Sequence, residues 1–134
     1  MILLIDNYDS FVFNVEQYIK EITDEEILCV RNDKITMEEI RRLNPSKIVL
    51  SPGPKHPQDS GICLEILKSD ITAPILGICL GHQAIGLVYG AKIKRLEKPY
   101  HGKTSLIKVS RKEPLFTGLP DEFEVMRYHS LYVD

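Results

Sequence analysis

The sequence predicts a three-layer α/β fold, with helices covering a mostly parallel, doubly wound sheet that has a more β-rich flank. Short apolar runs alternate with segments of helical periodicity over about ninety residues, which is typical of βαβ units. After Gly90 the pattern changes to strand-like segments without helices between them. With 134 residues and 43% hydrophobic side chains, the chain can bury one core. We therefore expect a single domain over residues 1–134.

Four apolar runs predict buried parallel strands. The first, ILLI, ends in the polar turn DNYDS, and the others are also short runs bounded by charged or turn-forming residues. We expect these strands at residues 2–5, 26–31, 47–51 and 74–78.

Helices are predicted between the strands. The first begins with Asp9 or Ser10 as its cap and presents one apolar stripe to the sheet. That stripe comprises Phe11, Val15, Tyr18, Ile19 and Ile22. Thr36 and Glu39 have the spacing of a capping box, which starts a second, short helix through about Leu43.

The third helix is marked by Ile62, Ile66 and Leu67, and the fourth spans residues 81–90, with Gly90 just after its cap. The segment SPGPKHPQDSG before the third helix holds three prolines and two glycines, so we expect a rigid loop without regular structure. Beyond Gly90, three shorter strands are expected, at residues 91–96, 104–109 and 122–133.

Composition excludes several classes of function. The formal net charge is −2 and no basic stripe occurs, which argues against nucleic acid and anionic membranes as partners. No apolar run reaches the length of a signal sequence or a membrane span, so we expect a cytoplasmic protein. Cys29, Cys63 and Cys79 lack the spacing of a disulfide framework or a metal site, and free thiols suit a reducing compartment. We expect no metal or organic cofactor in this chain.

Cys79 is the candidate nucleophile. It lies between Gly77 and Gly81, where the fourth strand turns into the fourth helix. Such a turn strains one residue and exposes its side chain above the carboxyl edge of the sheet, and small neighbours prevent clashes. The helix N-terminus, beginning with the N–H of Leu80, favours a thiolate and faces a developing oxyanion, so we expect a lowered pKa for Cys79. The alternative is a small apolar cysteine in a tight turn.

Five ordered motifs resemble the class I glutamine amidotransferase domain over the whole chain. They are DNYDSF (6–11), SPGP (51–54), GICLGHQ (77–83), HGK (101–103) and YHSL (128–131). DNYDSF looks like the glutaminase component, component II, of anthranilate synthase or of the related aminodeoxychorismate synthase. It argues against the amidotransferase domains of GMP synthase and carbamoyl phosphate synthase.

The resemblance implies a flavodoxin-like core and an activity. L-glutamine would be hydrolysed through a cysteine thioester, and the ammonia would pass to a chorismate-binding synthase subunit, component I. Any magnesium would belong to that partner. The anthranilate route to tryptophan and the aminodeoxychorismate route to folate both remain open.

The resemblance also assigns roles by position. Cys79 would carry the γ-glutamyl group, and the backbone N–H groups of Leu80 and Gly53 would hold the oxyanion. A glycine can present its amide without a side chain in the way. The glutamine-binding residues would be Gly53, Pro54, Lys55, Gln83, Ser130 and Leu131. Lys55 stands where the family usually has a glycine.

Several polar residues near these motifs receive other assignments. His82 is expected to be structural and His56 to lie in the loop. His101 and Lys103 are expected in a loop near the active-site entrance or the partner interface. Two interpretations stay open for the turn after the first strand, a turn-and-cap role or a place on the partner-facing rim; its residues are Asn7, Tyr8 and Asp9.

The proton acceptor for the thiol is missing from these residues. The family supplies it from a His-x-Glu segment near its C-terminus, and no histidine of this sequence is followed by x-Glu. His129 falls in the glutamine-binding stretch and is not taken as the base. We expect a piece of a longer protein, or an incompletely represented one, rather than a naturally shortened subunit. Residues 1–134 alone should hydrolyse glutamine poorly or not at all. A catalytically silent binding subunit and an unrelated cysteine hydrolase of similar fold are the alternatives.

Overall fold

The computed structural model describes residues 1–134, which form two compact units. Unit 1 comprises Met1–Lys94 with Val133–Asp134, and unit 2 comprises Arg95–Tyr132. The single domain expected over residues 1–134 stays a prediction.

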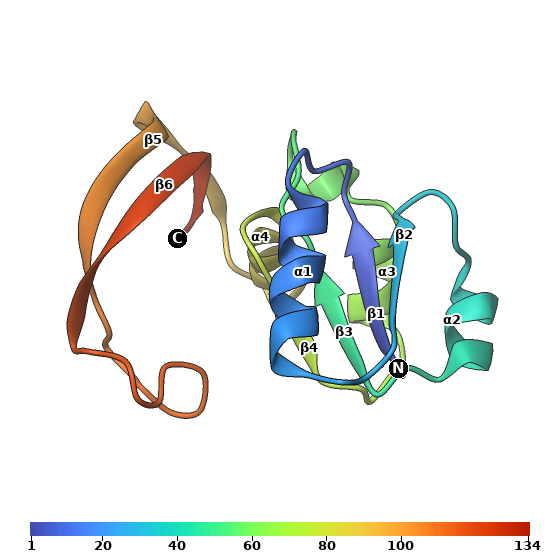
Figure 1. Ribbon diagram of the computed structural model, residues 1–134. Coiled ribbons are helices and arrows are strands. Elements are labelled where there is room, and N and C mark those ends of the chain that lie inside the picture. Colours follow the sequence, from blue (N-terminus) through green and yellow to red (C-terminus); the bar gives the residue numbers. More distant parts are fainter. The chain divides into compact units, whose positions relative to one another are not determined.

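Unit 1 is built on a four-stranded parallel sheet (Figure 1). The strands, in the order β2-β1-β3-β4, are β2 (Ile27–Arg31), β1 (Ile2–Asp6), β3 (Lys47–Leu50) and β4 (Ile75–Gly77). In register, Ile5 pairs with Val30 and Leu50, and Leu50 also pairs with Gly77. The carboxyl ends of all four strands therefore lie along one edge. The four predicted strands are confirmed.

Helices cover both faces of this sheet (Figure 1). On one face, Leu3 and Ile5 belong to a core shared with α2 (Met37–Leu43) and α3 (Ile62–Lys68). On the other face, Ile2 and Leu4 pack with α1 (Val12–Ile22). Successive side chains of a strand point to opposite faces, so each buried strand supplies both cores and reads as a continuous apolar run. The predicted three-layer α/β arrangement is confirmed.

The first helix starts later than its sequence predicts. α1 begins at Val12, with Phe11 as its N-cap residue. The turn before it is closed by Asp9, whose backbone N–H donates to Asp6 Oδ1 at 3.0 Å and whose carboxylate accepts the N–H of Phe11. These bonds keep residues 9 and 10 in the turn, so the prediction of a cap at Asp9 or Ser10 was wrong.

The buried face of α1 is also rotated from the predicted stripe. The residues that pack on the sheet are Val12, Val15 and Ile19. The exposed ones are Phe11, Tyr18 and Ile22. Because each helical residue turns the chain by about 100°, moving the first inward position from 11 to 12 carries Tyr18 and Ile22 into solvent.

The second helix begins as predicted. Thr36 Oγ1 accepts the Glu39 N–H at 3.2 Å, and the Glu39 carboxylate accepts the Thr36 N–H at 2.8 Å, which makes a complete capping box. The fourth helix, α4 (Leu80–Val88), is followed by Gly90 at φ +92°, as its sequence predicts. No helix of the chain has both the length and the apolar character that a membrane crossing requires.

The proline-rich loop after β3 contains one regular element, so the prediction of none was wrong there. η1 (Pro57–Asp59) is a single turn of 3₁₀ helix. Pro57 is favoured at this first position because its fixed φ suits a helix and its missing N–H would have no partner. His56 Nδ1 accepts the Gln58 N–H at 3.1 Å and caps the turn.

Most of β5 (Ile93–Lys108) and β6 (Glu122–Val133) lies in unit 2, where they form a two-stranded sheet. The separate strands predicted at 91–96 and 104–109 are one strand, so His101 and Lys103 lie in β5 and not in a loop. Gly102 joins the two halves at φ +76°, and a Cβ there would lie 2.7 Å from Tyr128 Oη. The glycine thus lets β5 pass beneath the Tyr128 ring.

Candidate active site

The turns after β1, β3 and β4 leave the carboxyl edge of the sheet next to one another. The Ser51 N–H donates to Ile5 O and the Ile78 N–H donates to Leu50 O, each at 3.0 Å. In open α/β sheets this edge is where ligands bind. The structure therefore gathers three of the motifs, DNYDSF, SPGP and GICLGHQ, at one place in unit 1.

Cys79 has the strained backbone that its sequence context predicts. It is the N-cap residue of α4, with φ 52° and ψ −103°. Its carbonyl accepts the Gln83 N–H at 2.9 Å, which is the first hydrogen bond of the helix. This region of φ and ψ costs a non-glycine residue about 1–3 kcal/mol. The side chain is exposed beyond the end of β4.

The two glycines beside Cys79 are required for space. A Cβ on Gly77 would lie 2.5 Å from the Gly81 carbonyl carbon. A Cβ on Gly81 would overlap Leu50 O and lie 2.6 Å from Leu50 Cβ. Since the obstructing atoms are mostly backbone, neither position accepts a side chain without moving β3, β4 or α4.

The pKa of the Cys79 thiol is raised from its ordinary value, so the expectation of a lowered pKa was wrong. Desolvation of the sulfur by the surrounding protein is the largest cause. A hydrogen bond from the Leu80 N–H lowers the pKa, as expected at a helix N-terminus, but less than desolvation raises it. The charge of Asp9 raises it further. The resting sulfur is therefore a thiol that needs a proton acceptor.

Gly53 and Leu80 are neighbours in the fold. The point that a Gly53 Cβ would occupy lies 3.0 Å from Leu80 Cδ2 and 2.5 Å from Asn7 O. The Leu80 N–H is directed at the Cys79 sulfur. The structure thus brings together the two residues predicted to supply the oxyanion hole, and their role as donors stays a prediction.

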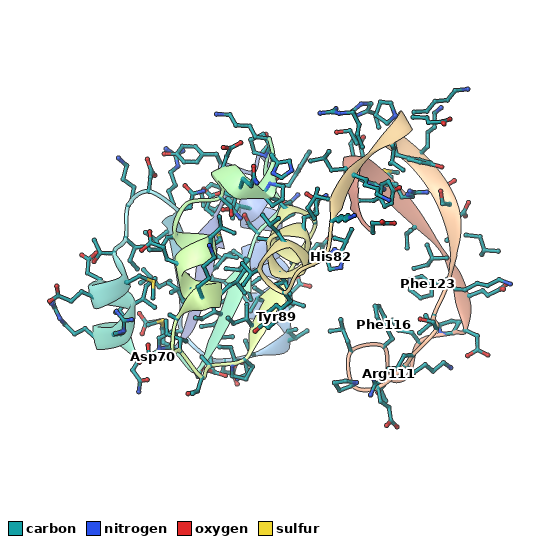
Figure 2. The ribbon with its side chains drawn as sticks, turned by 180° about the vertical axis from the view of Figure 1, so that it is seen from behind. Asp70, His82, Tyr89, Arg111, Phe116 and Phe123 are labelled. Atoms are coloured by element: carbon teal, nitrogen blue, oxygen red, sulfur yellow. The ribbon has the colours of Figure 1, made fainter.

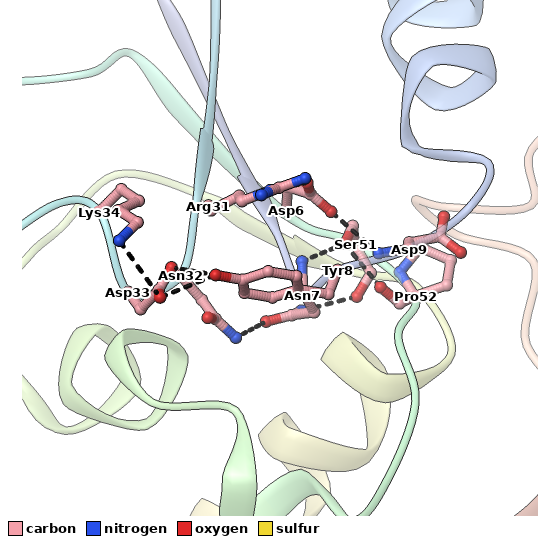
Figure 3. Close-up of polar contacts among 10 residues, drawn as sticks. All are labelled: Asp6, Asn7, Tyr8, Asp9, Arg31, Asn32, Asp33, Lys34, Ser51 and Pro52. Carbon is pink, nitrogen blue, oxygen red and sulfur yellow. Dashed lines mark hydrogen bonds and ion pairs between the residues drawn. The ribbon is translucent and has the colours of Figure 1, made fainter.

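Asn7 anchors the turn that carries Gly53, a role that its sequence context does not reveal. Figure 3 shows its side-chain amide between the turns after β1, β2 and β3. Asn7 Nδ2 donates to Ser51 O at 2.8 Å, and Asn7 Oδ1 accepts from Asn32 Nδ2 at 3.0 Å. Both Asn7 and Ser51 are buried. The only signal in the sequence is the position of Asn7 and Ser51 at the ends of two apolar runs. In the structure, Asn7 directly follows β1 and Ser51 directly follows β3.

Tyr8 and Asp9, also in this turn, differ in exposure. Tyr8 has φ +60°, its hydroxyl donates to the Asp33 carboxylate at 2.7 Å, and the Arg31 guanidinium lies 4.7 Å from its ring centroid (Figure 3). Asp9 Oδ2 is buried without a hydrogen-bond partner. Burial raises the pKa of the Asp9 carboxyl, the Phe11 N–H lowers it and the charge of Asp6 raises it again.

Comparison with known proteins assigns the family. The model of the class-I glutamine amidotransferase family matches residues 3–134. The chain belongs to this family. It is 50% identical, over its whole length and 70% of the relative's, to anthranilate synthase component 2 of Porphyra purpurea. It is 48% identical, over its whole length and 71% of the relative's, to aminodeoxychorismate synthase component 2 of Escherichia coli.

A solved structure gives the same result at lower identity. A Thermoplasma acidophilum protein whose description names GMP synthase has a TM-score of 0.80 and 30% identity. The match covers 98% of this chain and 65% of that one. The component 2 relatives are closer in sequence, which agrees with the interpretation of DNYDSF. The predicted resemblance to class I amidotransferases of the component 2 type is confirmed.

The other positions in unit 1 that the resemblance assigns to glutamine binding differ in exposure. Pro54 and Lys55 are exposed. Lys55 takes φ +71°, a left-handed backbone conformation that glycine adopts more readily than lysine. Gln83 is only 6% exposed, which is unusual for a glutamine on a helix and separates it from an ordinary surface residue. The binding roles stay predictions.

Ser130 and Leu131 belong to unit 2, next to a histidine whose ring is fully engaged. His129 Nε2 accepts the Arg127 Nε–H at 2.9 Å, so the ring proton is on Nδ1, which donates to Leu131 O at 2.7 Å. With both nitrogens in use, His129 has no free position for a substrate proton. This agrees with leaving it out of the catalytic residues.

His82 is exposed on α4 (Figure 2). No group of three or more histidine, cysteine, aspartate or glutamate side chains is placed to hold a metal ion. Burial raises the pKa of the Cys29 and Cys63 thiols to about 11, and both side chains are less exposed than that of Cys79.

Proposed function

We propose that this chain is the glutaminase part of a chorismate-aminating synthase of the component 2 type. The observation that carries the proposal is Cys79, a strained and exposed cysteine with the Leu80 N–H directed at its sulfur. A cysteine that only packs in an ordinary turn would need neither the strained backbone nor two flanking glycines at positions that have no space for a side chain.

The chemistry follows from this geometry. The Cys79 sulfur loses its proton and attacks the γ-carbonyl carbon of glutamine, forming a C–S bond and an oxyanion. The N–H groups of Leu80 and Gly53 stabilise that charge. The oxyanion collapses, the C–N bond breaks and ammonia leaves with the proton. Water then attacks the thioester and releases glutamate, which restores the thiol. Glutamine binding would use Gly53, Pro54, Lys55, Gln83, Ser130 and Leu131.

The proton acceptor is proposed to come from outside residues 1–134. None of the four histidines is followed by x-Glu, and both ring nitrogens of His129 are engaged. Because the pKa of the Cys79 thiol is raised, the reaction depends on such an acceptor. Its loss lowers the rate of this kind of step by about 10²- to 10⁴-fold.

The names of the relatives support the proposed partner. Similar proteins are called component 2 of anthranilate synthase and of aminodeoxychorismate synthase, and one relative from Bacillus subtilis carries both names. We propose that ammonia from this chain is delivered to a chorismate-binding component I. Tryptophan and folate synthesis both fit the names, with the anthranilate route as the leading assignment. The thioester chemistry needs no cofactor, and three free cysteines suit the cytoplasm.

A second candidate is a silent subunit that keeps the fold and docks on the synthase without turnover. The absence of His-x-Glu in residues 1–134 favours it. The two candidates differ in the state of Cys79, since a silent subunit has no use for an attacking thiol.

Covalent labelling separates them. The protein is incubated with diazo-oxo-norleucine, a glutamine analogue that alkylates a nucleophile in a glutamine site, and the modified residue is found by mass spectrometry. We expect rapid labelling of Cys79 that excess glutamine slows, while Cys29 and Cys63 stay unmodified. Cys79→Ser should abolish it. Labelling that is absent, or that glutamine does not slow, would favour the silent subunit.

A further inference from the structure

Asn7 makes long-range contacts that a turn or cap residue does not need. It is 2% exposed at the end of β1. Its hydrogen-bond partners Asn32, Ser51 and Cys63 lie 25, 44 and 56 residues away in sequence. A residue that only shapes its own turn bonds to backbone groups two or three positions away. The partners of Asn7 instead join the turns after β2 and β3 and the helix α3.

The bonding of Asn7 is extensive and concentrated on Ser51. The backbone N–H of Asn7 donates to Ser51 Oγ at 2.9 Å, and its Nδ2 donates to Ser51 O at 2.8 Å. On the other side, Oδ1 accepts from Asn32 Nδ2 at 3.0 Å and from the Cys63 thiol at 3.2 Å. The acceptor atom is thereby fixed from two directions, so the amide cannot rotate. Buried polar networks that are satisfied in this way rigidify the segments that they join.

Ser51 transmits this rigidity toward Gly53. Its hydroxyl also donates to Pro52 O at 2.6 Å, and its N–H donates to Ile5 O at 3.0 Å. The chain then passes directly over Asn7, because a Gly53 Cβ would lie 2.5 Å from Asn7 O and 2.6 Å from Asn7 Cβ. Asn7 therefore fixes Ser51, two residues before Gly53, by hydrogen bonds, and it packs directly against Gly53.

We propose that Asn7 is a positioning residue for the oxyanion hole, which fixes the direction of the Gly53 N–H through Ser51. The proposal rests on the function proposed above, in which Gly53 is an oxyanion donor. The hydrogen bonds of Asn7 go to Ser51, Asn32 and Cys63, and none of them involves the Cys79 sulfur. The effect of Asn7 is confined to reactions in which a carbonyl oxygen must be held, and it does not extend to the reactivity of the thiol alone.

Two reagents separate these reactions. Iodoacetamide alkylates Cys79 by displacement of iodide, without an oxyanion. A chloroketone analogue of glutamine places a ketone where the γ-carbonyl would lie, so its reaction benefits from the oxyanion donors. The second-order rate constants with both reagents are measured on the whole protein, for wild type, Asn7→Ala and Ser51→Ala. Asn14→Ala, an exposed asparagine of α1, is the matched control.

We expect Asn7→Ala to slow the chloroketone reaction by about tenfold or more while the iodoacetamide rate changes less than twofold, since removal of an oxyanion donor costs about 10²–10³ in rate. Ser51→Ala removes the two hydrogen bonds of the Ser51 hydroxyl. It should lower the ratio of the chloroketone rate constant to the iodoacetamide rate constant by a smaller factor than Asn7→Ala. Asn14→Ala should match wild type.

The outcomes distinguish the two proposals. If wild-type Cys79 reacts no faster with the glutamine chloroketone than with a simple chloroketone that lacks the glutamine group, the glutaminase proposal fails. If the wild type shows this preference and the Asn7 and Ser51 variants keep it, the positioning role of Asn7 is wrong. Should Asn7→Ala not fold, as judged by thermal unfolding, Ser51→Ala decides the question by the same ratio.

Discussion

Gly61 and Cys79 adopt nearly the same backbone conformation, each as the N-cap residue of a helix. Gly61 has φ 56° and ψ −118° before α3, and Cys79 has φ 52° and ψ −103° before α4. Glycine enters this region readily, whereas a residue with a Cβ is strained there. The same turn geometry is therefore relaxed at one helix and strained at the other, and the strained one carries the proposed nucleophile.

Replacement of Cys79 by glycine should stabilise the protein. Cys79→Gly removes a strain of about 1–3 kcal/mol, partly offset by the greater flexibility of glycine in the unfolded chain. We expect the free energy of unfolding to rise by about 1 kcal/mol in urea titrations, with all labelling lost. Cys63→Gly is the contrasting variant and should destabilise, since Cys63 is buried inside α3. A less stable Cys79→Gly would show that the elbow is not strained.

Gly81→Ala should be far more damaging than Gly90→Ala. The added methyl at 81 meets the backbone of Leu50, while at 90 nothing lies within 4 Å and only the dihedral, φ +92°, is unfavourable. We expect losses of about 3 kcal/mol and about 1 kcal/mol, measured by thermal unfolding. Equal losses would mean that packing at the elbow is loose.

Removal of the Asp9 charge should ease ionisation of the thiol. Since that charge raises the pKa of Cys79, Asp9→Asn should lower it. The pH midpoint of iodoacetamide alkylation would then shift toward lower pH. Asp33→Asn removes an exposed carboxylate that is bonded to Tyr8 and should leave the midpoint unchanged. An unshifted midpoint in Asp9→Asn would show that the Asp9 charge does not influence the ionisation of Cys79.

Lys55→Gly should also stabilise, by about 0.5–1 kcal/mol, because Lys55 is exposed and held at φ +71°. Lys34→Gly is the control, since Lys34 is an exposed turn lysine without a positive φ, and it should be neutral or slightly destabilising. Chemical denaturation of both variants tests this. A loss of stability in Lys55→Gly would show that the lysine side chain stabilises the loop.

Acid sensitivity should depend on Glu25. Hydrogen bonds from Lys47, Ser46 and the N-terminal amine lower the pKa of Glu25 from 4.5 to about 2. Because the folded state binds this proton more weakly, the contribution is present above about pH 4.5 and disappears as the pH falls toward about 2. Wild type and Glu25→Gln should therefore differ in melting temperature at pH 7 and converge near pH 2. Glu26→Gln serves as the control, and a constant difference across this range would contradict the assignment.

Local sequence was sufficient for those parts of the fold that depend on neighbouring residues. The strands follow from runs such as ILLI because both faces of the sheet are covered, and α2 follows from its capping box. The strained backbone at Cys79 follows from the flanking glycines. The class of the fold and the place of the proposed nucleophile therefore follow from local sequence.

Most of the errors concern features set by distant residues. The inward face of α1 is the exception, because it depends on the local turn closed by Asp9, whereas the continuity of β5 depends on Gly102 passing under Tyr128. The pKa of Cys79 is set by desolvation and by Asp9, neither of which adjoins it in sequence. Asn7 is the clearest case, because the partners that define its role lie up to 56 residues away.

The order of the strands has a consequence for newly made chains. Cys79 is forced into its unusual geometry only when β4 has paired with β3 and Gly81 has docked on Leu50. β3 in turn lies beside β1, from the very start of the chain. During synthesis, before these segments meet, Cys79 is an unstrained thiol without an assembled pocket. The proposed glutaminase reaction therefore requires that β1, β3 and β4 have paired and that the start of α4 has docked on β3.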